Sequence, residues 1–363
     1  MEARITNVGV AIYAIPTDAP ESDGTYAWDS TTLVLVEITA GERIGLGYSY
    51  ADEATATLIR RTLADVVTGR DAFAIPETWA AMAHAVRNLG RPGIASMAIA
   101  AVDTALWDLK ARLLDLPLAV LLGQARAGVP VYGSGGFTSY SKEQLQTQLT
   151  AWARIGIRRV KMKVGSRPAA DPDRVRDARD AIGPDVELFV DANGAYTRKQ
   201  ALALAEIFAG LGVSWFEEPV SSDDLDGLHL LQRRAPAGMA IAAGEYGYDL
   251  PYFRRMLAAQ AVDVLQADAT RCAGITGFLR VADICRAHQV PFSAHCAPYL
   301  HLHAACSLDV IHHLEYFHDH VRIAHLLFDG LTEPREGVLH PDLSRPGLGL
   351  EFKHRDAERF AVR

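Results

Sequence analysis

Lysine, cysteine and long apolar runs are all scarce in this sequence of 363 residues. No apolar run reaches the roughly 18 to 20 residues that a membrane-spanning helix needs, and the first residues lack the charged-then-apolar order of a signal peptide. The 36 basic residues are scattered and the net charge is −8, so the clustered basic face of a nucleic-acid-binding protein is missing. We therefore expect a cytoplasmic protein that binds neither membranes nor nucleic acids.

The few cysteines and lysines that are present differ in what they indicate. Cys272, Cys285, Cys296 and Cys306 form neither a CxxC pair nor a zinc-binding spacing, so we expect reduced, buried thiols. Only six of the 36 basic residues are lysines, and two of the six, Lys161 and Lys163, lie two positions apart. The remaining composition, with 49% hydrophobic and 22% charged residues, is typical of a globular protein with a large core.

The first part of the chain, residues 1–125, has the pattern of an α+β domain. β-type runs cover residues 31–39 and 43–50, and helical patterns follow near residues 53–67, 76–88 and 94–114. We expect residues 17–30 to form a polar loop that carries Tyr26 and Trp28.

From about residue 129 onward, short β-type runs alternate with helical segments. The eight runs are residues 129–135, 158–165, 186–194, 213–219, 239–245, 262–268, 290–296 and 312–317. Alternating β and α units predict a parallel sheet, and eight units predict a closed barrel. The fold class we expect is therefore α/β, with a (β/α)-barrel over residues 126–325. A Gly/Pro-rich segment, residues 326–363, should return to pack on the first domain.

Every predicted barrel strand from the second to the eighth ends in ionisable side chains. These residues are Lys161 and Lys163, Asp191, Glu217, Glu245, Asp268, His295 and Glu315. Active sites of such barrels lie at the carboxyl ends of the strands. A ring of buried charge is costly unless it binds something, so this end of the barrel is the candidate site.

Three of these residues suit a divalent cation. Asp191, Glu217 and Glu245 come from consecutive strands and offer only carboxylate oxygens, which Mg²⁺ prefers. Side chains alternate along a strand, so only one of Glu217 and Glu218 can face the barrel axis, and our choice of Glu217 rests in part on the family resemblance given below. The alternative for each acid is an ordinary polar strand end.

The lysines, the histidine and its partners suit acid/base chemistry. Lys161 and Lys163 point to the same face of their strand, where mutual repulsion and burial are expected to lower the pKa of each ammonium. One of them could then act as a general base, while Lys161 holds a substrate carboxylate. An aspartate that accepts from one imidazole nitrogen raises the basicity of the ring, which predicts a pair of Asp268 and His295. Solvated lysines and a structural histidine remain the alternatives.

Taken together, the motifs resemble the mandelate racemase subgroup of the enolase superfamily. They are KMK (161–163), DANG (191–194), EEP (217–219), AGE (243–245), Asp268, AHC around His295, and Glu315. The helix text AAVDTALWDLKARLLDLPLAVLLG is similar to the last helix of the family's capping domain, so the resemblance covers essentially the whole chain. It implies a barrel of the modified TIM type beneath an N-terminal capping domain.

The resemblance also implies a role for each site residue. Members use a lysine or histidine base and Mg²⁺ to remove a proton next to a carboxylate. Lys163 would be one acid/base, and His295 paired with Asp268 would be the other. Asp191, Glu217 and Glu245 would hold Mg²⁺, Lys161 would neutralise the substrate carboxylate, and Glu315 would bind the enolic oxygen.

Three reactions or roles stay open at this point. Dehydration of an acid sugar to a 2-keto-3-deoxy acid is favoured, because relatives with this residue set often perform it. A racemase or epimerase of a 2-hydroxy acid would use the same two acid/bases, and a non-catalytic binding barrel is a third reading. A phosphate-sugar enzyme is disfavoured, since residues 296–303 offer no glycine-rich phosphate loop.

The segments expected to select the substrate, a small-molecule carboxylate, are residues 17–30, 48–52 and 132–140. Tyr26, Trp28 and Ser134 are the substrate-contact candidates within them. We also expect the protein to be a homo-oligomer.

Overall fold

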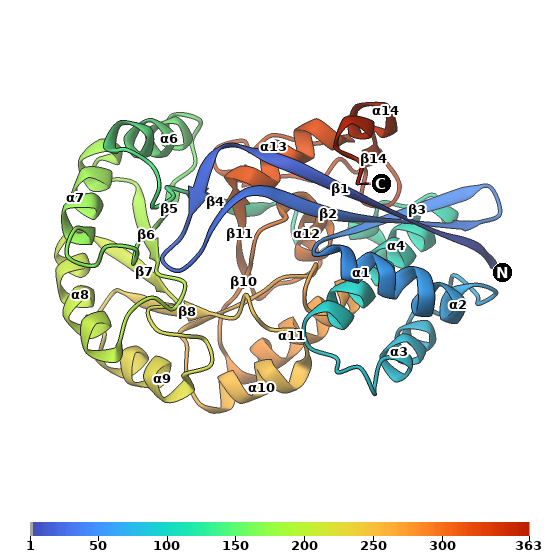
Figure 1. Cartoon of the computed structure of the whole chain (residues 1–363), viewed down its shortest axis with the longest axis horizontal. Coiled ribbons are helices and arrows are strands. Elements are labelled where there is room, and N and C mark those ends of the chain that lie inside the picture. The colour runs from blue at the N-terminus through green and yellow to red at the C-terminus, as the bar shows by residue number, and fades with distance from the viewer. Residues whose placement is uncertain (1–2, 363) are drawn as a thin grey trace.

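Two large sheets organise residues 3–362, which the computed structural model describes (Figure 1). The first is antiparallel and contains β1 (Ile5–Ser22), β2 (Ala27–Ala40) and β3 (Arg43–Tyr50). The helices that follow are α1 (Glu53–Leu58), α2 (Ala64–Val67), α3 (Ile75–Ala85) and α4 (Ile94–Leu113), with a π-helical turn, Ile59–Leu63, between the first two. The three predicted helical regions and the two predicted strands of this domain are confirmed.

The close packing of α4 on the sheet depends on small residues. A Cβ atom at Gly47 in β3 would lie 2.2 Å from the carbonyl oxygen of Ala101 in α4, well inside van der Waals contact. Ala98, Ala101 and Ala105 are fully buried. Because neither element carries bulk at this contact, the helix backbone approaches the strand directly.

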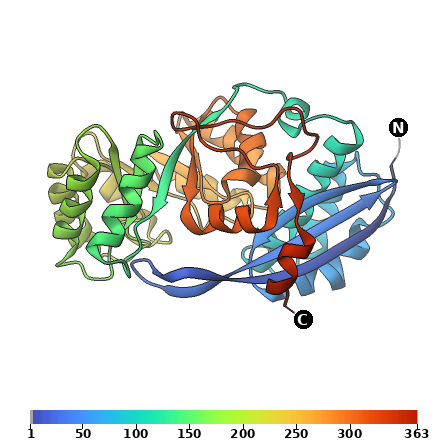
Figure 2. The same ribbon diagram turned by 90° about the horizontal axis from the view of Figure 1, so that it is seen from above.

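The prediction of a polar loop over residues 17–30 is wrong. Strands β1 and β2 continue through most of it and pair at Glu21 with Trp28 and at Ser22 with Ala27. The Asp23 carboxylate accepts hydrogen bonds from the backbone N–H groups of Thr25 and Tyr26 at 2.6 and 2.7 Å and so closes a tight turn. This two-stranded ribbon leaves the cap and reaches the barrel (Figures 1 and 2). The sequence of the ribbon lacks the alternating apolar pattern of a half-buried strand, so these parts of the two strands were not predicted.

The second sheet is the predicted barrel, and all eight predicted strands are confirmed. They are β4 (Val129–Gly135), β5 (Arg159–Lys163), β6 (Glu187–Asp191), β7 (Val213–Glu217), β8 (Ala240–Ala243), β9 (Val264–Ala267), β10 (Phe292–Ala294) and β11 (Ile311–Phe317). Neighbours among these eight strands run parallel, and β11 pairs with β4 to close the ring. A ninth strand of two residues, Val338–Leu339, pairs antiparallel with β4. The outer helices are α6 (Lys142–Arg154), α7 (Asp171–Ile182), α8 (Arg198–Gly210), α9 (Leu225–Arg234), α10 (Leu250–Ala258), α11 (Gly274–His288), α12 (Pro298–Cys306) and α13 (His318–Leu327), and α5 (Leu118–Leu122) precedes the barrel.

A layer of apolar and aromatic side chains fills the inside of the barrel. It consists of Tyr132, Phe189, Trp215, Ala242 and Val264, and the rings of Phe189 and Trp215 stack with their centroids 5.1 Å apart. The barrel is therefore a packed core and not a pore.

The C-terminal segment returns toward the cap, as Figure 2 shows. Its elements are β12 (Phe328–Asp329), β13 (Val338–Leu339), β14 (Glu351–Phe352), α14 (His354–Ala357) and a 3₁₀ turn, Glu358–Phe360. The N–H of Val362 donates to the carbonyl of Ile12 at 2.9 Å, which ties the end of the chain to β1. The boundary predicted at residues 325/326 falls inside α13, and the boundary at 125/126 stays a prediction. Among residues 3–362, no helix combines the length and apolarity needed to cross a bilayer.

Candidate active site

Strand register brings the predicted ionisable residues together at one end of the barrel. Lys163 is the direct neighbour of Asp191 across β5 and β6, and Asp191 is the neighbour of Glu217 across β6 and β7. The eight residues are Lys161, Lys163, Asp191, Glu217, Glu245, Asp268, His295 and Glu315, and none is more than 6% exposed. So many charged side chains can be buried only when oppositely charged or hydrogen-bonding groups lie close to them.

Asp191, Glu217 and Glu245 form a compact group of carboxylates, which we call the carboxylate trio. One oxygen of each lies within 4.8 Å of one oxygen of the other two. Glu217 is held most firmly, because its Oε2 accepts hydrogen bonds from Trp215 Nε1 at 2.9 Å and Gln266 Nε2 at 3.0 Å. Burial raises the pKa of Glu217 to about 8, with the nearby Asp191 carboxylate acting in the same direction.

Glu218, the competitor of Glu217, lies beside the trio and outside it. Its backbone has a left-handed φ of 37°, its side chain is 1% exposed, and its Oε1 finds no hydrogen-bond partner within residues 3–362. Burial, and after it the Glu245 carboxylate, raises its pKa well above the ordinary value.

The charge of the site is strongly unbalanced. If all were ionised, the six buried carboxyl groups would exceed the three permanent cations by three charges before His295 is counted, and the raised pKa values of Glu217 and Glu218 accord with that excess. The six are Asp191, Glu217, Glu218, Glu245, Asp268 and Glu315, and the three are Lys161, Lys163 and Arg271. An all-oxygen trio, an unpartnered carboxylate oxygen beside it and an excess of negative charge together fit a hard divalent cation.

Both lysines contact carboxylates directly. Lys163 Nζ lies 2.5 Å from Asp191 Oδ2, and Lys161 Nζ lies 2.6 Å from Glu217 Oε1 and 2.8 Å from Glu315 Oε1. The expectation of lowered lysine pKa values is wrong for this arrangement. Burial does favour the neutral amines, but the adjacent carboxylates outweigh it and raise the pKa of both lysines well above the ordinary value.

His295 is oriented by Asp268, as the sequence predicts. Its Nδ1 lies 2.9 Å from Asp268 Oδ2, and its Nε2 lies 3.3 Å from Glu245 Oε2. Burial disfavours the charged ring, yet Cys296, Glu245 and the Asp268 hydrogen bond outweigh it and raise the pKa of His295 well above the ordinary value. The imidazole therefore tends to hold a proton on the nitrogen that faces the trio.

Glu315 has hydrogen-bond or ion-pair partners on both of its carboxylate oxygens. Its Oε1 accepts a hydrogen bond from Ser134 Oγ at 2.6 Å and contacts Lys161, while its Oε2 accepts from the N–H of Cys296 at 2.8 Å. Burial opposes ionisation, but Lys161 and His295 lower the pKa of Glu315 far below the ordinary value. Ser134, predicted as a substrate contact, thus lies in the barrel interior with its hydroxyl directed at Glu315.

The aromatic candidates lie on the β1–β2 ribbon. Tyr26 is 69% exposed and stacks on Trp28 at a centroid distance of 6.2 Å. Trp28 donates its Nε1–H to Glu21 at 2.7 Å and packs with the edge of Phe137 at 5.5 Å. Phe137 in turn belongs to a buried cluster with Cys296 and Phe317. The ribbon therefore covers the side of the site where His295 and Glu315 lie.

The residues that contact the site and were missed by the sequence reasoning include Trp215, Gln266, Arg271 and Cys296. A signal existed for the first two, because each lies two positions before a site residue and so shares its face of the strand. Arg271 donates to the backbone carbonyl of Glu245 at 3.0 Å and lies 3.8 Å from Asp268. Its position in a loop gives no periodic signal.

Comparison with family models covers nearly the whole chain. Residues 7–123 match the N-terminal domain of mandelate racemase and muconate lactonizing enzymes, and residues 144–357 match the enolase C-terminal domain-like family. An L-talarate/galactarate dehydratase of Salmonella typhimurium is 31% identical over 96% of this chain and 88% of its own length. A 3,6-anhydro-alpha-L-galactonate cycloisomerase of Streptomyces coelicolor is 33% identical, with 99% of each chain covered.

Solved structures agree with these matches. A mandelate racemase/muconate lactonizing enzyme-like protein from Rubrobacter xylanophilus superposes with a TM-score of 0.97 at 58% identity and covers 99% of this chain and 100% of its own. A racemase from Streptomyces coelicolor with bound magnesium gives a TM-score of 0.93 at 32% identity, over 99% of this chain and 100% of its own. This chain therefore belongs to the mandelate racemase/muconate lactonizing enzyme family and is an enzyme of the enolase superfamily.

Proposed function

We propose that this enzyme removes the proton α to the carboxylate of an acid sugar and expels the β-hydroxyl, which yields a 2-keto-3-deoxy acid. The similarity to an L-talarate/galactarate dehydratase supports the substrate class. Asp191, Glu217 and Glu245 are proposed to hold the Mg²⁺ that the reaction requires.

One observation carries the proposal: the carboxylate trio lies between two acid/base groups. Asp191 contacts Lys163 at 2.5 Å on one side, and Glu245 contacts His295 Nε2 at 3.3 Å on the other. A substrate carboxylate placed at the trio would have its α-carbon near one of these groups and its β-hydroxyl near the other. Elimination of water needs both a base and an acid in that arrangement.

Lys163 is the proposed base. Its ammonium is stabilised by Asp191, and a cation held by Asp191 would remove much of that stabilisation. The pKa of Lys163 would then be lower, which would favour the neutral amine that can accept the α-proton.

His295 is the proposed acid. Asp268 accepts from Nδ1–H, so the second proton of the charged ring sits on Nε2, the atom that faces the trio. Donation of this proton to the departing hydroxyl converts it to water, a far better leaving group than hydroxide.

Mg²⁺, Lys161 and Glu315 are proposed to stabilise the negative charge that develops on the substrate carboxylate. The bound Mg²⁺ would act as a Lewis acid that stabilises negative charge on the carboxylate oxygens. Lys161, fully buried, adds a fixed positive charge from below. Glu315, with the support of Ser134, is positioned to hydrogen-bond a protonated substrate oxygen.

The ribbon supplies the proposed cover and part of the substrate contact. Trp28 packs over Phe137, and Tyr26 continues the stack outward. Excluding water strengthens every electrostatic interaction beneath such a cover.

Isomerisation is the second candidate, and the match to a cycloisomerase over 99% of both chains favours keeping it. A racemase or epimerase of a 2-hydroxy acid would use the same two groups, with His295 returning a proton to the opposite face of the α-carbon.

A screen of sugar acids with Mg²⁺ in deuterated water tests the proposal. Dehydration gives a 2-keto-3-deoxy acid with deuterium at C3, which NMR and mass spectrometry detect. Racemisation or epimerisation gives unchanged connectivity, with deuterium at C2 and inverted configuration. If only the second outcome occurs across the library, isomerisation replaces dehydration as the function.

A further inference from the structure

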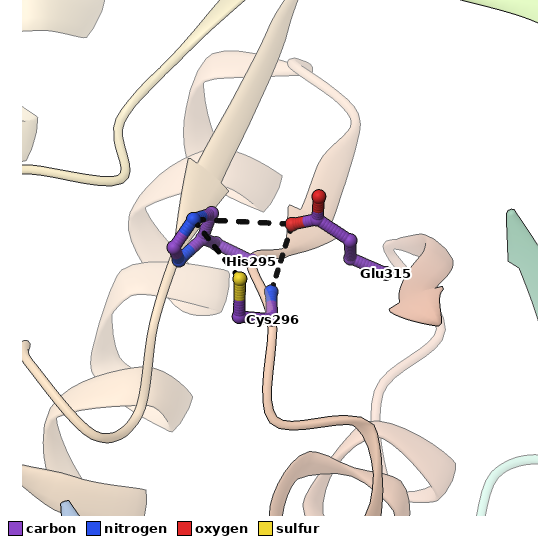
Figure 3. A group of neighbouring side chains, drawn as sticks. All are labelled: His295, Cys296 and Glu315. Atoms are coloured by element: carbon purple, nitrogen blue, oxygen red, sulfur yellow. Dashed lines mark hydrogen bonds and ion pairs between the residues drawn. The ribbon is translucent and has the colours of Figure 1, made fainter. Parts of the chain in front are cut away.

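Cys296 has no part in the proposed reaction, yet it lies against the acid group (Figure 3). Its Sγ is 3.3 Å from His295 Nε2, and that nitrogen is 3.9 Å from Glu315 Oε2. One potential ligand atom of each residue lies within 4.8 Å of those of the other two, and all three side chains are buried. We call this group the His–Cys–Glu cluster.

A left-handed turn creates the cluster. Consecutive side chains in a regular strand point to opposite faces, so His295 and Cys296 could not meet if β10 continued. Instead β10 ends at Ala294, and both Cys296 and Ala297 have left-handed φ angles of 50° and 39°. Residues other than glycine rarely adopt this conformation, and its cost is often retained at functional positions.

The donor atoms differ in kind from those of the carboxylate trio. An imidazole nitrogen, a sulfur and a carboxylate oxygen suit Zn²⁺ and its softer relatives, whereas three carboxylates suit Mg²⁺. Zn–S and Zn–N bonds of about 2.3 and 2.0 Å place tetrahedral S and N ligands roughly 3.5 Å apart. The Sγ–Nε2 spacing of 3.3 Å is close to that value, and the Nε2–Oε2 spacing of 3.9 Å exceeds the roughly 3.4 Å of tetrahedral N and O ligands by about half an ångström.

The surroundings of the cluster already orient its ligands. Asp268 accepts from His295 Nδ1–H, which leaves the lone pair of the neutral ring on Nε2, inside the cluster. A carboxylate behind a histidine in this way is the usual support of a zinc ligand. Glu315 is fixed by hydrogen bonds from Ser134 Oγ and from the N–H of Cys296.

The remaining sides of the cluster are either closed or able to complete the coordination. Phe137 and Phe317 pack with Cys296 and form an apolar wall, against which Trp28 rests. Glu245 belongs to the carboxylate trio, so a water molecule would complete the coordination as the fourth ligand. An apolar wall limits the access of solvent to a metal site, and a position without a protein ligand leaves room for a water molecule.

We propose that His295, Cys296 and Glu315 form a second metal site, distinct from the carboxylate trio, that binds Zn²⁺ or Cd²⁺ in preference to Mg²⁺ and inhibits the enzyme. Binding replaces the S–H proton of Cys296, which is released to solvent, and requires His295 in its neutral form. Inhibition follows because Nε2 of His295 then carries the metal and no longer a proton. Only this inhibitory consequence rests on the proposed function, and metal binding itself does not.

The binding test uses the full chain saturated with Mg²⁺ and titrated with Cd²⁺. The wild-type protein should show thiolate-to-Cd²⁺ charge-transfer absorption in the ultraviolet, with one Cd²⁺ bound per chain while Mg²⁺ remains. Cys296→Ser should lose this absorption and keep its Mg²⁺ affinity. Cys306→Ser is the control. It changes a different buried cysteine, the last residue of α12, and should behave as wild type. Equal absorption in Cys296→Ser and wild type would overturn the proposal.

A second measurement guards against a Cys296→Ser protein that fails to fold. X-ray absorption at the zinc edge of the wild-type protein with Mg²⁺ in excess should reveal one sulfur neighbour at about 2.3 Å. A shell of oxygen neighbours alone, or loss of one Mg²⁺ for every Zn²⁺ bound, would place zinc at the trio and overturn the second site. These readouts need no substrate, so they separate a failed metal site from a failed proposal of dehydration.

The inhibition test compares wild type with Cys296→Ser, each relative to its own activity with Mg²⁺ alone. Micromolar Zn²⁺ should inhibit wild type at least about tenfold more strongly than the variant. Equal inhibition of both proteins would show that zinc acts elsewhere.

Discussion

His295 and Asp268 come from neighbouring strands, β10 and β9, and their 2.9 Å contact decides which imidazole nitrogen faces the substrate side. With Nδ1 committed to Asp268, Nε2 is the nitrogen available to give or take a proton. His295→Asn should therefore lower dehydration about 100- to 10,000-fold, the usual contribution of a general acid. Exchange of the α-proton with deuterated water should continue, because that step needs only Lys163. NMR of recovered substrate measures the exchange, and its loss together with dehydration would reassign the base to His295.

The two lysines should fail in different ways when their ammonium groups are removed. Lys163→Met keeps most of the side-chain length and should lower turnover by at least about 1000-fold. Binding of a substrate analogue should survive, because the base acts only in the transition state. Lys161→Met should instead weaken analogue binding, because Lys161 provides charge beneath the carboxylate. Calorimetry and steady-state kinetics on both proteins separate the roles. Full activity of Lys163→Met would exclude it as the base.

Glu217 and Glu218 are a matched pair of adjacent glutamates with which the assignment of the metal ligand can be tested. Glu217→Gln should lower Mg²⁺ affinity by at least about 100-fold, a larger loss than that from removing an outer-shell partner of a ligand. Glu218→Gln should change it less than about tenfold. Calorimetric titration of both variants measures the effect. Undiminished affinity in Glu217→Gln, with a large loss in Glu218→Gln, would exchange the two assignments.

The ribbon meets the barrel at Gly24. A Cβ atom there would lie 2.4 Å from the carbonyl oxygen of Ala192 and 2.6 Å from that of Val164, at the ends of β6 and β5. Gly24→Ala should therefore lift the ribbon and reduce kcat/KM at least about tenfold. Gly9→Ala, in β1 before the ribbon and with its nearest neighbour at 3.6 Å, is the control and should keep wild-type kinetics. Equal kinetics in both variants would show that the position of the ribbon does not affect the reaction.

The junction of cap and barrel should make stability depend on pH. Asp103 in α4 accepts hydrogen bonds from the N–H and the hydroxyl of Thr276 in α11 at 2.8 and 2.7 Å, and burial raises its pKa to about 7. The unfolded value is about 3.9, so between about pH 4 and 7 the folded state keeps a proton that the unfolded state has lost. The free energy of unfolding then falls as the pH rises through this window and changes no further above it.

Asp103→Asn removes the titrating group and should flatten this dependence. Urea unfolding at pH 5 and pH 8 measures it, with the exposed Asp65→Asn in the same domain as control. Parallel pH profiles for wild type and Asp103→Asn would contradict the assignment.

Much of the fold and of the ring of polar residues could be predicted from the sequence alone. A parallel barrel places the carboxyl end of every strand on the same side, so an ionisable residue at each strand end is enough to predict a shared site. Lys163, Asp191 and Glu217 are neighbours for that reason, and the spacing of βα units along the chain reveals it. Periodicity two within a strand likewise places Lys161 and Lys163 on one face.

Only the tertiary structure decided the features that depend on distances between strands or on irregular backbone. Whether Lys163 is surrounded mainly by Lys161 or by Asp191 determines the direction of its pKa shift, and no sequence pattern contains that distance. At Glu21 and Trp28 the ribbon buries a carboxylate and an indole and not aliphatic residues, so its sequence shows no alternation of apolar and polar residues. Cys296 contacts His295 because Cys296 and Ala297 adopt a left-handed turn. Cysteine and alanine have no preference for this conformation, so the sequence does not predict the turn, and the surrounding contacts hold it in place.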